Sequence, residues 1–226
     1  MNNKLPKIII ILGPTGAGKS TLAMDLCKTL PCEIVSADSM QVYKYLDIGT
    51  AKPSISDQES VPHHMIDLIN PDESLDAFNY QKQANVKISE IIAKKKIPLI
   101  VGGTGLYIRA LQYGIFELNG YTIDQNKIKQ VKEEIAEWKN NNMDKSLHQL
   151  LSKVDLESSK KIMPNDYHRI ERALLVYFAT SKKMSEFQRE HNFQEKRFTT
   201  LKIGISPKRD VLYTKINERV QSMVNN

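Results

Sequence analysis

Cysteine is scarce in this sequence, and the two cysteines that it has do not form a recognisable motif. Cys27 and Cys32 lie five residues apart, without a CxxC spacing and without a histidine close by. Metal sites and redox motifs use other spacings, and small disulfide-stabilised proteins contain more cysteines. We therefore interpret both residues as ordinary thiols of a protein from a reducing compartment.

Long apolar runs and aromatic residues are also few. Residues 8–12 (IIIIL) form the longest apolar run near the start, and a glycine-rich stretch follows it at once. This run is too short for a signal peptide or a membrane span. Aromatic residues make up 7% of the 226 residues, but 41% are hydrophobic, which is enough for a folded core. These features predict a cytoplasmic protein with no membrane association.

The charge is positive and unevenly distributed. The net charge is +6, to which residues 1–114 contribute +1 and residues 115–226 contribute +5. A basic second half suits a polyanionic partner such as RNA. Many lysine-rich proteins are mildly basic without such a partner, so the charge by itself leaves both interpretations open.

The first half of the chain alternates between strand and helix patterns. Residues 7–12 form a β-branched run that is typical of a strand buried on both faces of a parallel sheet. Further elements follow, separated by an irregular segment at 43–75. We predict a helix at 19–30, a strand from 33, a helix at 75–96 with Phe78, Val86, Ile88, Ile91 and Ile92 as its apolar positions, a strand at 97–101 and a helix at 106–113. This alternation predicts an α/β fold, with a parallel sheet flanked by helices.

The second half carries only helical patterns between about residues 124 and 192. The pieces cover residues 128–138, 146–154, 166–180 and 185–191, and a strand at 199–205 and a helix at 208–223 follow them. We therefore predict an α/β core in 1–116, a helical insertion in 117–196, and the last strand and helix of the core in 197–226.

One motif points directly to phosphate chemistry. Residues Gly13, Pro14, Thr15, Gly16, Ala17, Gly18, Lys19 and Ser20 match G-x-x-x-x-G-K-[ST] between the first strand and the first helix. This is the context of a P-loop, in which backbone N–H groups and a helix N-terminus surround phosphate oxygens. Lys19 adds a full positive charge, and the hydroxyl of Ser20 is a ligand for Mg²⁺. The motif predicts binding of a di- or triphosphate but does not identify it.

The acids that hydrolysing P-loop enzymes use are missing. The strand at 97–101 ends in Gly102, Gly103 and Thr104 without an acid, and no Asn-Lys-x-Asp string reads guanine. The best remaining acid is Asp38, which follows the second strand and so lies at the ligand-binding edge of an open α/β sheet. Its carboxylate can hold a metal ion, accept a proton from an attacking group, or bond its own backbone in a turn.

Besides the P-loop, the sequence contains the strings SADSMQVY (36–43), LDIGTAKP (46–53), PHHMID (62–67), PLIVGGTGLY (98–107) and PNDYHRIERA (164–173), together with Arg219. These strings together resemble one family, the bacterial tRNA dimethylallyltransferases, also called tRNA isopentenyltransferases. The P-loop is shared with many unrelated enzymes, whereas the other strings are far more specific. They follow one another in order across nearly the whole chain.

The resemblance implies a P-loop NTPase-like fold and a reaction between two substrates. The P-loop would hold the diphosphate of dimethylallyl diphosphate with Mg²⁺ at Ser20, which explains the missing acid because no water has to be activated. Asp38 matches the general base that deprotonates N6 of adenosine 37 in the anticodon loop of tRNA. Thr104 matches a hydroxyl at the reacting region, and Arg219 matches a cation that holds the leaving diphosphate.

The resemblance also implies tRNA contacts and a monomeric protein. The matching tRNA-binding residues are Asp38, Ser39, Met40, Gln41, Thr104, His168, Arg169, Ile170, Glu171 and Arg172. Without the resemblance, we would interpret the charged residues at 168–172 as a solvent-exposed helix face. Family members usually continue with further helices that complete the core, and this chain has no such continuation after Asn226.

Three alternatives remain from the sequence alone. A small-molecule kinase would bind ATP in the P-loop and use Asp38 to position an acceptor hydroxyl. A relative that prenylates free adenine nucleotides would not need the basic insertion. A shortened, inactive relative would bind tRNA in a salt-dependent manner without modifying it.

Overall fold

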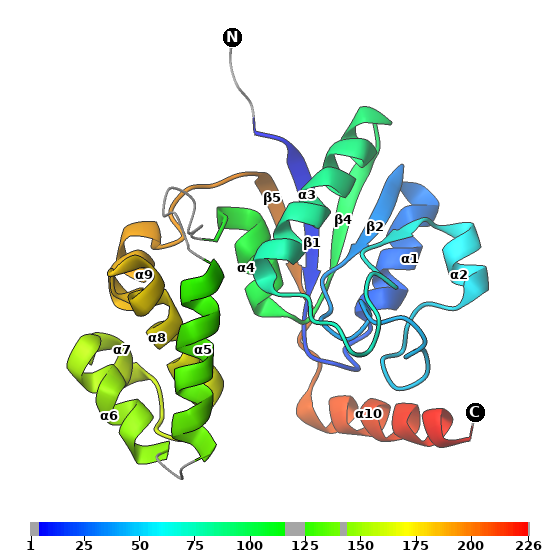
Figure 1. Ribbon diagram of the computed structural model, residues 1–226. Helices are drawn as coiled ribbons and strands as arrows, with labels where there is room; N and C mark the ends of the chain where they lie inside the picture. The colour runs from blue at the N-terminus through cyan, green and yellow to red at the C-terminus, as the bar shows by residue number, and fades with distance from the viewer. Residues whose placement is uncertain (1–4, 116–124, 141–143, 226) are drawn as a thin grey trace. The chain divides into compact units, whose positions relative to one another are not determined.

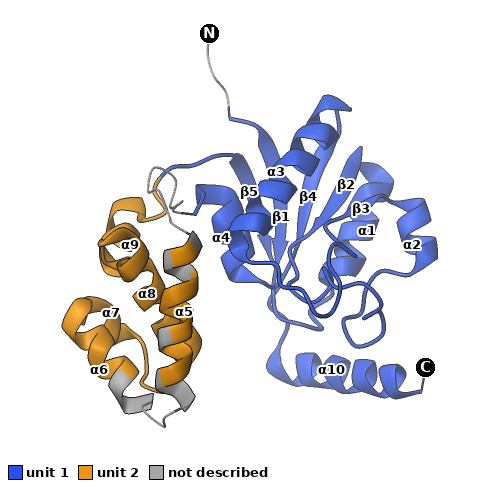
Figure 2. Cartoon of the chain, in the orientation of Figure 1, with its two compact units in different colours: residues 1–115, 195–226 blue, residues 116–194 orange. Residues whose placement is uncertain are grey.

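The chain folds into two compact units. The structure, a computed structural model, describes residues 5–115, 125–140 and 144–225 (Figure 1). Unit 1 comprises Met1–Ile115 and Glu195–Asn226, and unit 2 comprises Phe116–Gln194 (Figure 2). The domain boundary expected at 116 and 117 lies outside the described residues. The second one, expected at 196 and 197, lies at 194 and 195.

The described part of unit 1 contains a five-stranded sheet with the order β3-β2-β4-β1-β5. The strands are β1 (Lys7–Leu12), β2 (Cys32–Ser36), β3 (His63–His64), β4 (Ile97–Gly102) and β5 (Thr199–Gly204). All neighbouring strands pair in parallel, and Ile10 lies between Ile100 of β4 and Lys202 of β5. The predicted parallel sheet is confirmed. The isoleucine run of β1 is continuous because parallel sheets are covered on both faces.

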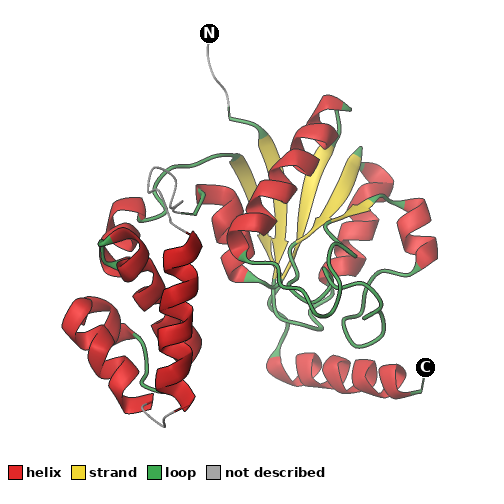
Figure 3. Cartoon of the chain, in the orientation of Figure 1, coloured by secondary structure: helices red, strands yellow, loops and turns green. Residues whose placement is uncertain are grey.

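Helices cover both faces of this sheet. The helices of unit 1 are α1 (Lys19–Thr29), α2 (Ile55–Ser60), α3 (Ala77–Ala93), α4 (Gly105–Tyr113) and α10 (Arg209–Val224). One core cluster joins the sheet to α3 and α4, and another joins it to α1. Figure 3 shows the loops gathered at the carboxyl ends of the strands, on the side where α10 lies.

The packing face of α3 differs from the prediction. Val86 and Ile92 were expected among its apolar positions, but both side chains are exposed. Ile88 faces the core as predicted, and Tyr80 and Ala84 face it as well. They recur every four residues and so form one stripe along the helix. The tyrosine and the alanine were missed because neither is strongly hydrophobic by type.

The segment expected to be irregular contains two short elements. Ser54 caps α2 by accepting the backbone N–H of Asp57, whose carboxylate accepts the N–H of Ser54 in return. The two-residue strand β3 pairs with Ile34 and Val35 of β2. Neither element is long enough to show a period in the sequence, so pattern reading overlooked both.

Unit 2 is helical, as expected, and has a core of its own. Its helices are α5 (Gln125–Asn140), α6 (Asp144–Val154), α7 (Leu156–Lys161), α8 (Tyr167–Thr180) and α9 (Met184–His191). Leu147, Leu151 and Ile170 are among the fully buried residues of this core. The short helix α7 was not predicted. No helix in the described ranges combines the length and the apolar character that crossing a membrane requires.

Candidate active site

Three strands of the sheet deliver the predicted site residues to one edge. β1 leads into the P-loop, Asp38 follows β2 by two residues, and Thr104 follows β4 by two residues. β4 lies between β1 and β2. Because all three strands are parallel, their carboxyl ends meet at the same edge, where open α/β sheets bind ligands. The strand order therefore brings together residues that lie up to about ninety positions apart in the sequence.

The P-loop has the backbone shape that phosphate binding requires. Gly16 and Gly18 have φ values of 79° and 90°, a conformation that side chains disfavour. A Cβ atom at Gly13 would lie 2.5 Å from the carbonyl oxygen of Ile205, so only glycine allows the segment after β5 to approach this closely. The Nζ atom of Lys19 donates hydrogen bonds of 2.8 Å to the carbonyl oxygens of Gly13 and Pro14.

Lys19 of the P-loop interacts electrostatically with two other predicted site residues, Asp38 and Arg219. Partial burial lowers the pKa of Lys19, the nearby cation Arg219 lowers it further, and the carboxylate of Asp38 opposes this shift. Within this group of three side chains the two cations outnumber the one carboxylate, so an anion that binds beside them is stabilised. The predicted base and the predicted cation therefore both lie within electrostatic range of the P-loop lysine.

Asp38 is held by its own backbone through one oxygen. Oδ1 accepts the backbone N–H of Met40 at 2.9 Å, as in an Asx turn. Within the described residues, no hydrogen bond occupies Oδ2, and the side chain is partly exposed. The turn interpretation is therefore correct for one oxygen, and it leaves the other oxygen available for a substrate proton.

Thr104 lies against the residue that follows Asp38. Its Oγ1 accepts the backbone N–H of Ser39 at 3.0 Å and is 3.3 Å from Ser39 Oγ, and its own N–H donates to the carbonyl oxygen of Ala37 at 3.1 Å. Thr104 therefore contacts the residues on both sides of Asp38.

Further contacts fix the end of β2. The hydroxyl of the fully buried Tyr80 donates to the carbonyl oxygen of Ser36 at 2.8 Å. The backbone N–H of Ala37 donates to Val101 at 2.8 Å. A Cβ atom at Gly102 would lie only 2.1 Å from the carbonyl oxygen of Ala37, so any side chain there would push the two strand ends apart. The position of Asp38 is therefore determined by rigid neighbours, which favours a reactive role.

One cavity of about 710 Å³ joins most of these groups. Its walls include residues 15–20 of the P-loop, Asp38, Gln41 and Arg219. Gly13, Pro14 and Thr104 do not line it. Gly13 and Pro14 hold Lys19, and Thr104 holds the segment that carries Asp38. The structure thus brings the predicted diphosphate site and the predicted base to one cavity.

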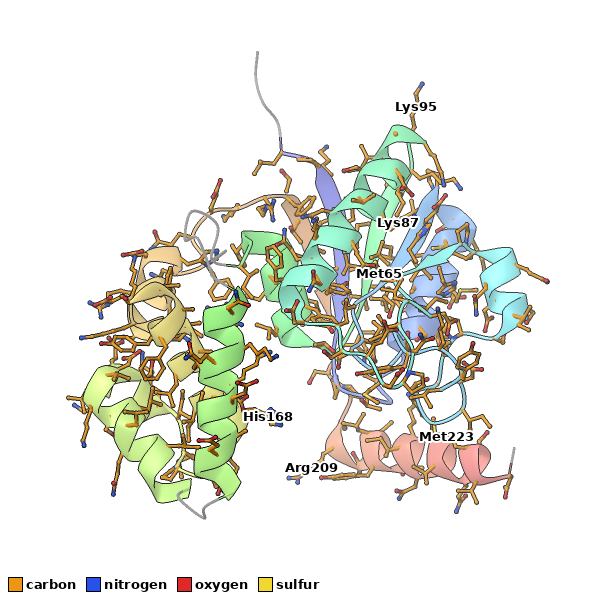
Figure 4. The ribbon with its side chains drawn as sticks, in the orientation of Figure 1. Met65, Lys87, Lys95, His168, Arg209 and Met223 are labelled. Atoms are coloured by element: carbon orange, nitrogen blue, oxygen red, sulfur yellow. The ribbon has the colours of Figure 1, made fainter. Side chains whose placement is uncertain are left out.

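Helix α10 contributes a second cation that the sequence analysis missed. Lys215 and Arg219 both line the cavity. They are four residues apart and so lie on the same side of the helix. α10 reaches the P-loop through Ile216, whose Cγ1 is 3.0 Å from the place where a Cβ of Gly16 would lie. Met223 lies on the side of α10 that faces the loops (Figure 4). The helical spacing from Arg219 was the signal that could have identified Lys215.

Lys52 is another cavity residue without a role in the sequence analysis. Its side chain is 3% exposed, and its Nζ donates to the Tyr43 carbonyl oxygen at 2.8 Å and to the carboxylates of Asp47 and Asp67 at 2.5 and 2.6 Å. It thereby joins three parts of the loop region that follows β2. The string LDIGTAKP contains this lysine, but no local pattern shows which residues it joins.

The predicted tRNA-binding residues after β2 differ in what they offer to a ligand. The Met40 side chain is exposed, and the backbone N–H of Ser39 is already bonded to Thr104. Gln41 uses its side chain internally, accepting from Ser36 Oγ at 2.9 Å and donating to Ala51 O at 3.1 Å. Gln41 therefore shapes the loop at the cavity wall.

The five predicted tRNA-binding residues of unit 2 lie on α8. His168, Arg169 and Arg172 are exposed, Glu171 is partly exposed, and Arg169 pairs with Asp166 at 3.3 Å. Figure 4 shows His168 among the side chains of unit 2. Ile170 requires a correction, because its side chain is fully buried in the helical core. We therefore assign that side chain to packing instead of RNA contact.

The predicted Mg²⁺ site was tested against the donor atoms that are present. No group of three or more histidine, cysteine or acidic side chains that could hold a metal occurs in the described residues. Mg²⁺ at phosphate sites needs fewer protein ligands, because phosphate and water oxygens fill most of its coordination shell. Ser20 is exposed at the start of α1 and lines the same cavity as Asp38. These residues fit a magnesium–diphosphate complex.

Comparisons with known proteins identify the family of this chain. The profile of the family described as IPP transferase matches residues 41–226. A tRNA dimethylallyltransferase of Geobacter sulfurreducens is 44% identical over 217 residues, which are 96% of this chain and 68% of the relative. One from Staphylococcus epidermidis is 42% identical over 219 residues, which are 97% of this chain and 65% of the relative.

Solved structures give the same result. The crystal structure of a Staphylococcus epidermidis tRNA isopentenylpyrophosphate transferase is similar with a TM-score of 0.60 and 41% identity, covering 97% of this chain and 70% of that one. A eukaryotic dimethylallyltransferase acting on tRNA is similar with a TM-score of 0.82 and 29% identity, covering 97% of this chain and 53% of that one. The chain therefore belongs to the IPP transferase family, the family of the tRNA dimethylallyltransferases.

Proposed function

We propose that this protein transfers the dimethylallyl group of dimethylallyl diphosphate to N6 of adenosine 37 in the anticodon loop of tRNA and releases diphosphate. Family membership supports a prenyl transferase that modifies tRNA over a small-molecule kinase. The observation that carries the proposal is the shared cavity, in which the P-loop, Arg219 and the carboxylate of Asp38 come together. A phosphate site next to a base is what transfer from a diphosphate to an amine requires.

The cations stabilise the charge that develops on the leaving group. As the bond between C1 of the prenyl group and the diphosphate oxygen breaks, negative charge grows on that oxygen. Lys19, Lys215 and Arg219 line the cavity, and the backbone N–H groups at the start of α1 add a positive field. Lys19 now bonds to the carbonyl oxygens of Gly13 and Pro14, and it can exchange them for phosphate oxygens.

In this proposal the carboxylate of Asp38 accepts the proton that the amine loses. N6 of adenine is a weak nucleophile because its lone pair is delocalised into the ring. As N6 bonds to C1, one of its protons moves to Oδ2 of Asp38, while Oδ1 stays bonded to the N–H of Met40. A positioned base of this kind typically accelerates a reaction by about 10²- to 10⁴-fold.

Ser20 and the diphosphate oxygens would hold Mg²⁺, with Asp38 across the same cavity. When bound, the ion neutralises charge on the diphosphate and so makes it a better leaving group. The residues of this chain orient the complex, because the P-loop fixes the phosphates and α10 places two cations opposite them.

The exposed polar side chains of α8 supply the contacts to the RNA backbone in this proposal. His168, Arg169 and Arg172 offer donors to phosphate oxygens, which gives salt-dependent affinity. The target adenosine leaves its stack to reach the cavity, as in other enzymes that act on a base. We infer that the protein acts in the cytoplasm, where its proposed substrates are found, and we expect it to be a monomer.

A product assay tests the proposal. The purified 226-residue chain is incubated with Mg²⁺, dimethylallyl diphosphate and an unmodified tRNA transcript, and the nucleosides are analysed by mass spectrometry. The expected product is N6-dimethylallyladenosine at position 37. This chain spans 65% to 68% of the length of the two tRNA dimethylallyltransferase sequences compared above. Binding of tRNA without product would identify an RNA-binding protein that does not catalyse the transfer.

A further inference from the structure

An exposed apolar surface borders the proposed active site. Tyr45, Leu46 and Ile48 follow the end of β2 within one loop, and their side chains are 79%, 39% and 52% exposed. We call these three residues the apolar rim. Single exposed apolar residues are common on proteins, but a cluster next to a ligand cavity indicates a binding surface. Ile48 lines the cavity that also contains Asp38.

The loop that carries the rim is held in one shape. The buried Nζ of Lys52 binds the backbone before the rim at Tyr43 and the carboxylate of Asp47 inside it. The same Nζ also binds Asp67, in the segment that follows β3. Gln41 adds a hydrogen bond to Ala51 on the far side of the loop. A fixed loop loses little conformational entropy when a ligand binds, which favours a recognition role.

Tyr45 has a backbone conformation that its side chain disfavours. Its φ is 66°, in the left-handed region, where a bulky residue is an outlier. The ring gains no compensating burial, because it is the most exposed of the three rim residues. Strained residues persist where the surrounding structure imposes them, and they cluster at functional sites. A strained and exposed tyrosine three residues before the cavity-lining Ile48 therefore points to a ligand for its ring.

We propose that the apolar rim stacks against unpaired bases of the RNA substrate next to the target adenosine, with Tyr45 as the main stacking residue. This inference rests on the proposed function. A base that approaches Asp38 enters a cavity with Ile48 in its wall, so the neighbouring nucleotides lie over the rim. Proteins recognise single-stranded RNA loops by stacking unstacked bases on aromatic rings.

A binding experiment separates this role from catalysis. Binding of an unmodified tRNA transcript is measured without dimethylallyl diphosphate by fluorescence anisotropy. Tyr45→Gly should weaken binding about tenfold, within the range for loss of one stacked base. Tyr45→Phe should bind like the wild type because the ring remains. Ile55→Ser, which removes an equally exposed apolar side chain outside the rim, is the matched control and should also bind normally.

The unfolding temperature of Tyr45→Gly also tests whether Tyr45 acts only by stabilising the fold. Because glycine accepts a positive φ without strain, Tyr45→Gly should unfold at the same or a higher temperature than the wild type while it loses RNA affinity. The inference is wrong if Tyr45→Gly binds tRNA as tightly as the wild type, if Ile55→Ser weakens binding equally, or if the wild type binds no tRNA. Self-association that Tyr45→Gly abolishes, with RNA binding unchanged, would assign the rim to a second copy instead.

The result can be distinguished from failure of the proposed function. A wild-type protein that binds tRNA but forms no product, together with weaker binding of Tyr45→Gly, would contradict the transferase activity and support the stacking surface. If the wild type forms product and Tyr45→Gly binds tRNA as tightly as the wild type, the transferase activity is supported and the stacking surface is contradicted.

Discussion

Thr104 Oγ1 accepts the backbone N–H of Ser39 at 3.0 Å and so joins the start of α4 to the residue after Asp38. Thr104 is the N-cap of α4, where a threonine side chain usually accepts an N–H of its own helix. No such capping bond is present here. The hydroxyl is instead directed at the segment that carries Asp38, which indicates a role in positioning that carboxylate.

Replacing Thr104 therefore tests this relationship. Thr104→Val keeps the shape but removes the hydroxyl, and we expect kcat to fall by about 10- to 100-fold because the segment around Asp38 loses a fixed contact. Thr104→Ser should retain most of the rate. Steady-state kinetics with saturating tRNA measures this difference, and equal rates for the valine variant and the wild type would contradict it. The affinity for inorganic diphosphate should stay unchanged in both variants.

Removal of the carboxylate of Asp38 separates the base from the diphosphate site. Asp38→Asn and Asp38→Ala should lower kcat by at least about 100-fold, because the proposed acceptor of the N6 proton is removed. Binding of diphosphate should be unchanged or tighter, because Asp38 opposes the positive charge of Lys19 and Arg219. Single-turnover kinetics and calorimetric titration with diphosphate measure the two effects. A variant with the full rate would show that the base has been assigned wrongly.

The cations of the cavity should affect diphosphate binding first. Lys19→Ala should weaken inorganic diphosphate binding by about 10- to 100-fold, since a hydrogen bond to a charged group contributes about 1.5–3 kcal/mol. Arg219→Gln and Lys215→Gln should also weaken diphosphate binding, and this loss of affinity should be smaller at high salt. Lys208→Gln removes an exposed charge from the start of the same helix, outside the cavity, and serves as the control. Equal losses in the control would mean that only net charge matters.

Glu33 should control the acid stability of unit 1. Its side chain is 2% exposed and bonds to His64 at 2.7 Å and Lys96 at 2.9 Å. Burial raises the pKa of Glu33, but the hydrogen bonds from Lys96 and His64 outweigh this and lower it to about 2. Because the folded-state pKa lies below the unfolded one, the stabilisation is complete above about pH 4.5 and is lost as the pH falls toward 2.

The variant Glu33→Gln tests this pH dependence. At pH 7 it should be less stable than the wild type by about 2–3 kcal/mol, and the difference should shrink as the pH falls below 4.5. Urea unfolding at several pH values measures both trends. A difference between the two proteins that stays constant from pH 7 to pH 3 would contradict the assigned pKa.

Much of the fold and the centre of the site could be predicted because their signals are local. The isoleucine run of β1 and the glycines of the P-loop determine their own backbone conformations, so each is visible in a short window. Asp38 could be placed because it lies two residues after the end of a strand. By contrast, the two-residue strand β3 carries no period and exists only through its pairing with β2.

Other predictions failed because burial depends on distant partners. Ile170 lies in a string that resembles a tRNA-binding segment, yet its helix turns that side chain into the core of unit 2. Val86 is strongly hydrophobic but exposed, whereas Tyr80 is fully buried and bonds to β2. Residue type favours burial, but only the packing of the helix against the sheet decides which face is covered.

The sequence by itself determined the phosphate loop and the alternation of strands and helices, because both depend on contacts between residues close together in the chain. The tertiary structure decided that Lys19, Asp38 and Arg219 share a cavity, because that depends on β4 pairing between β1 and β2 and on α10 packing over the loop. Gly102 illustrates the difference: the sequence shows a glycine, and only the approach of Ala37 explains why no larger residue fits.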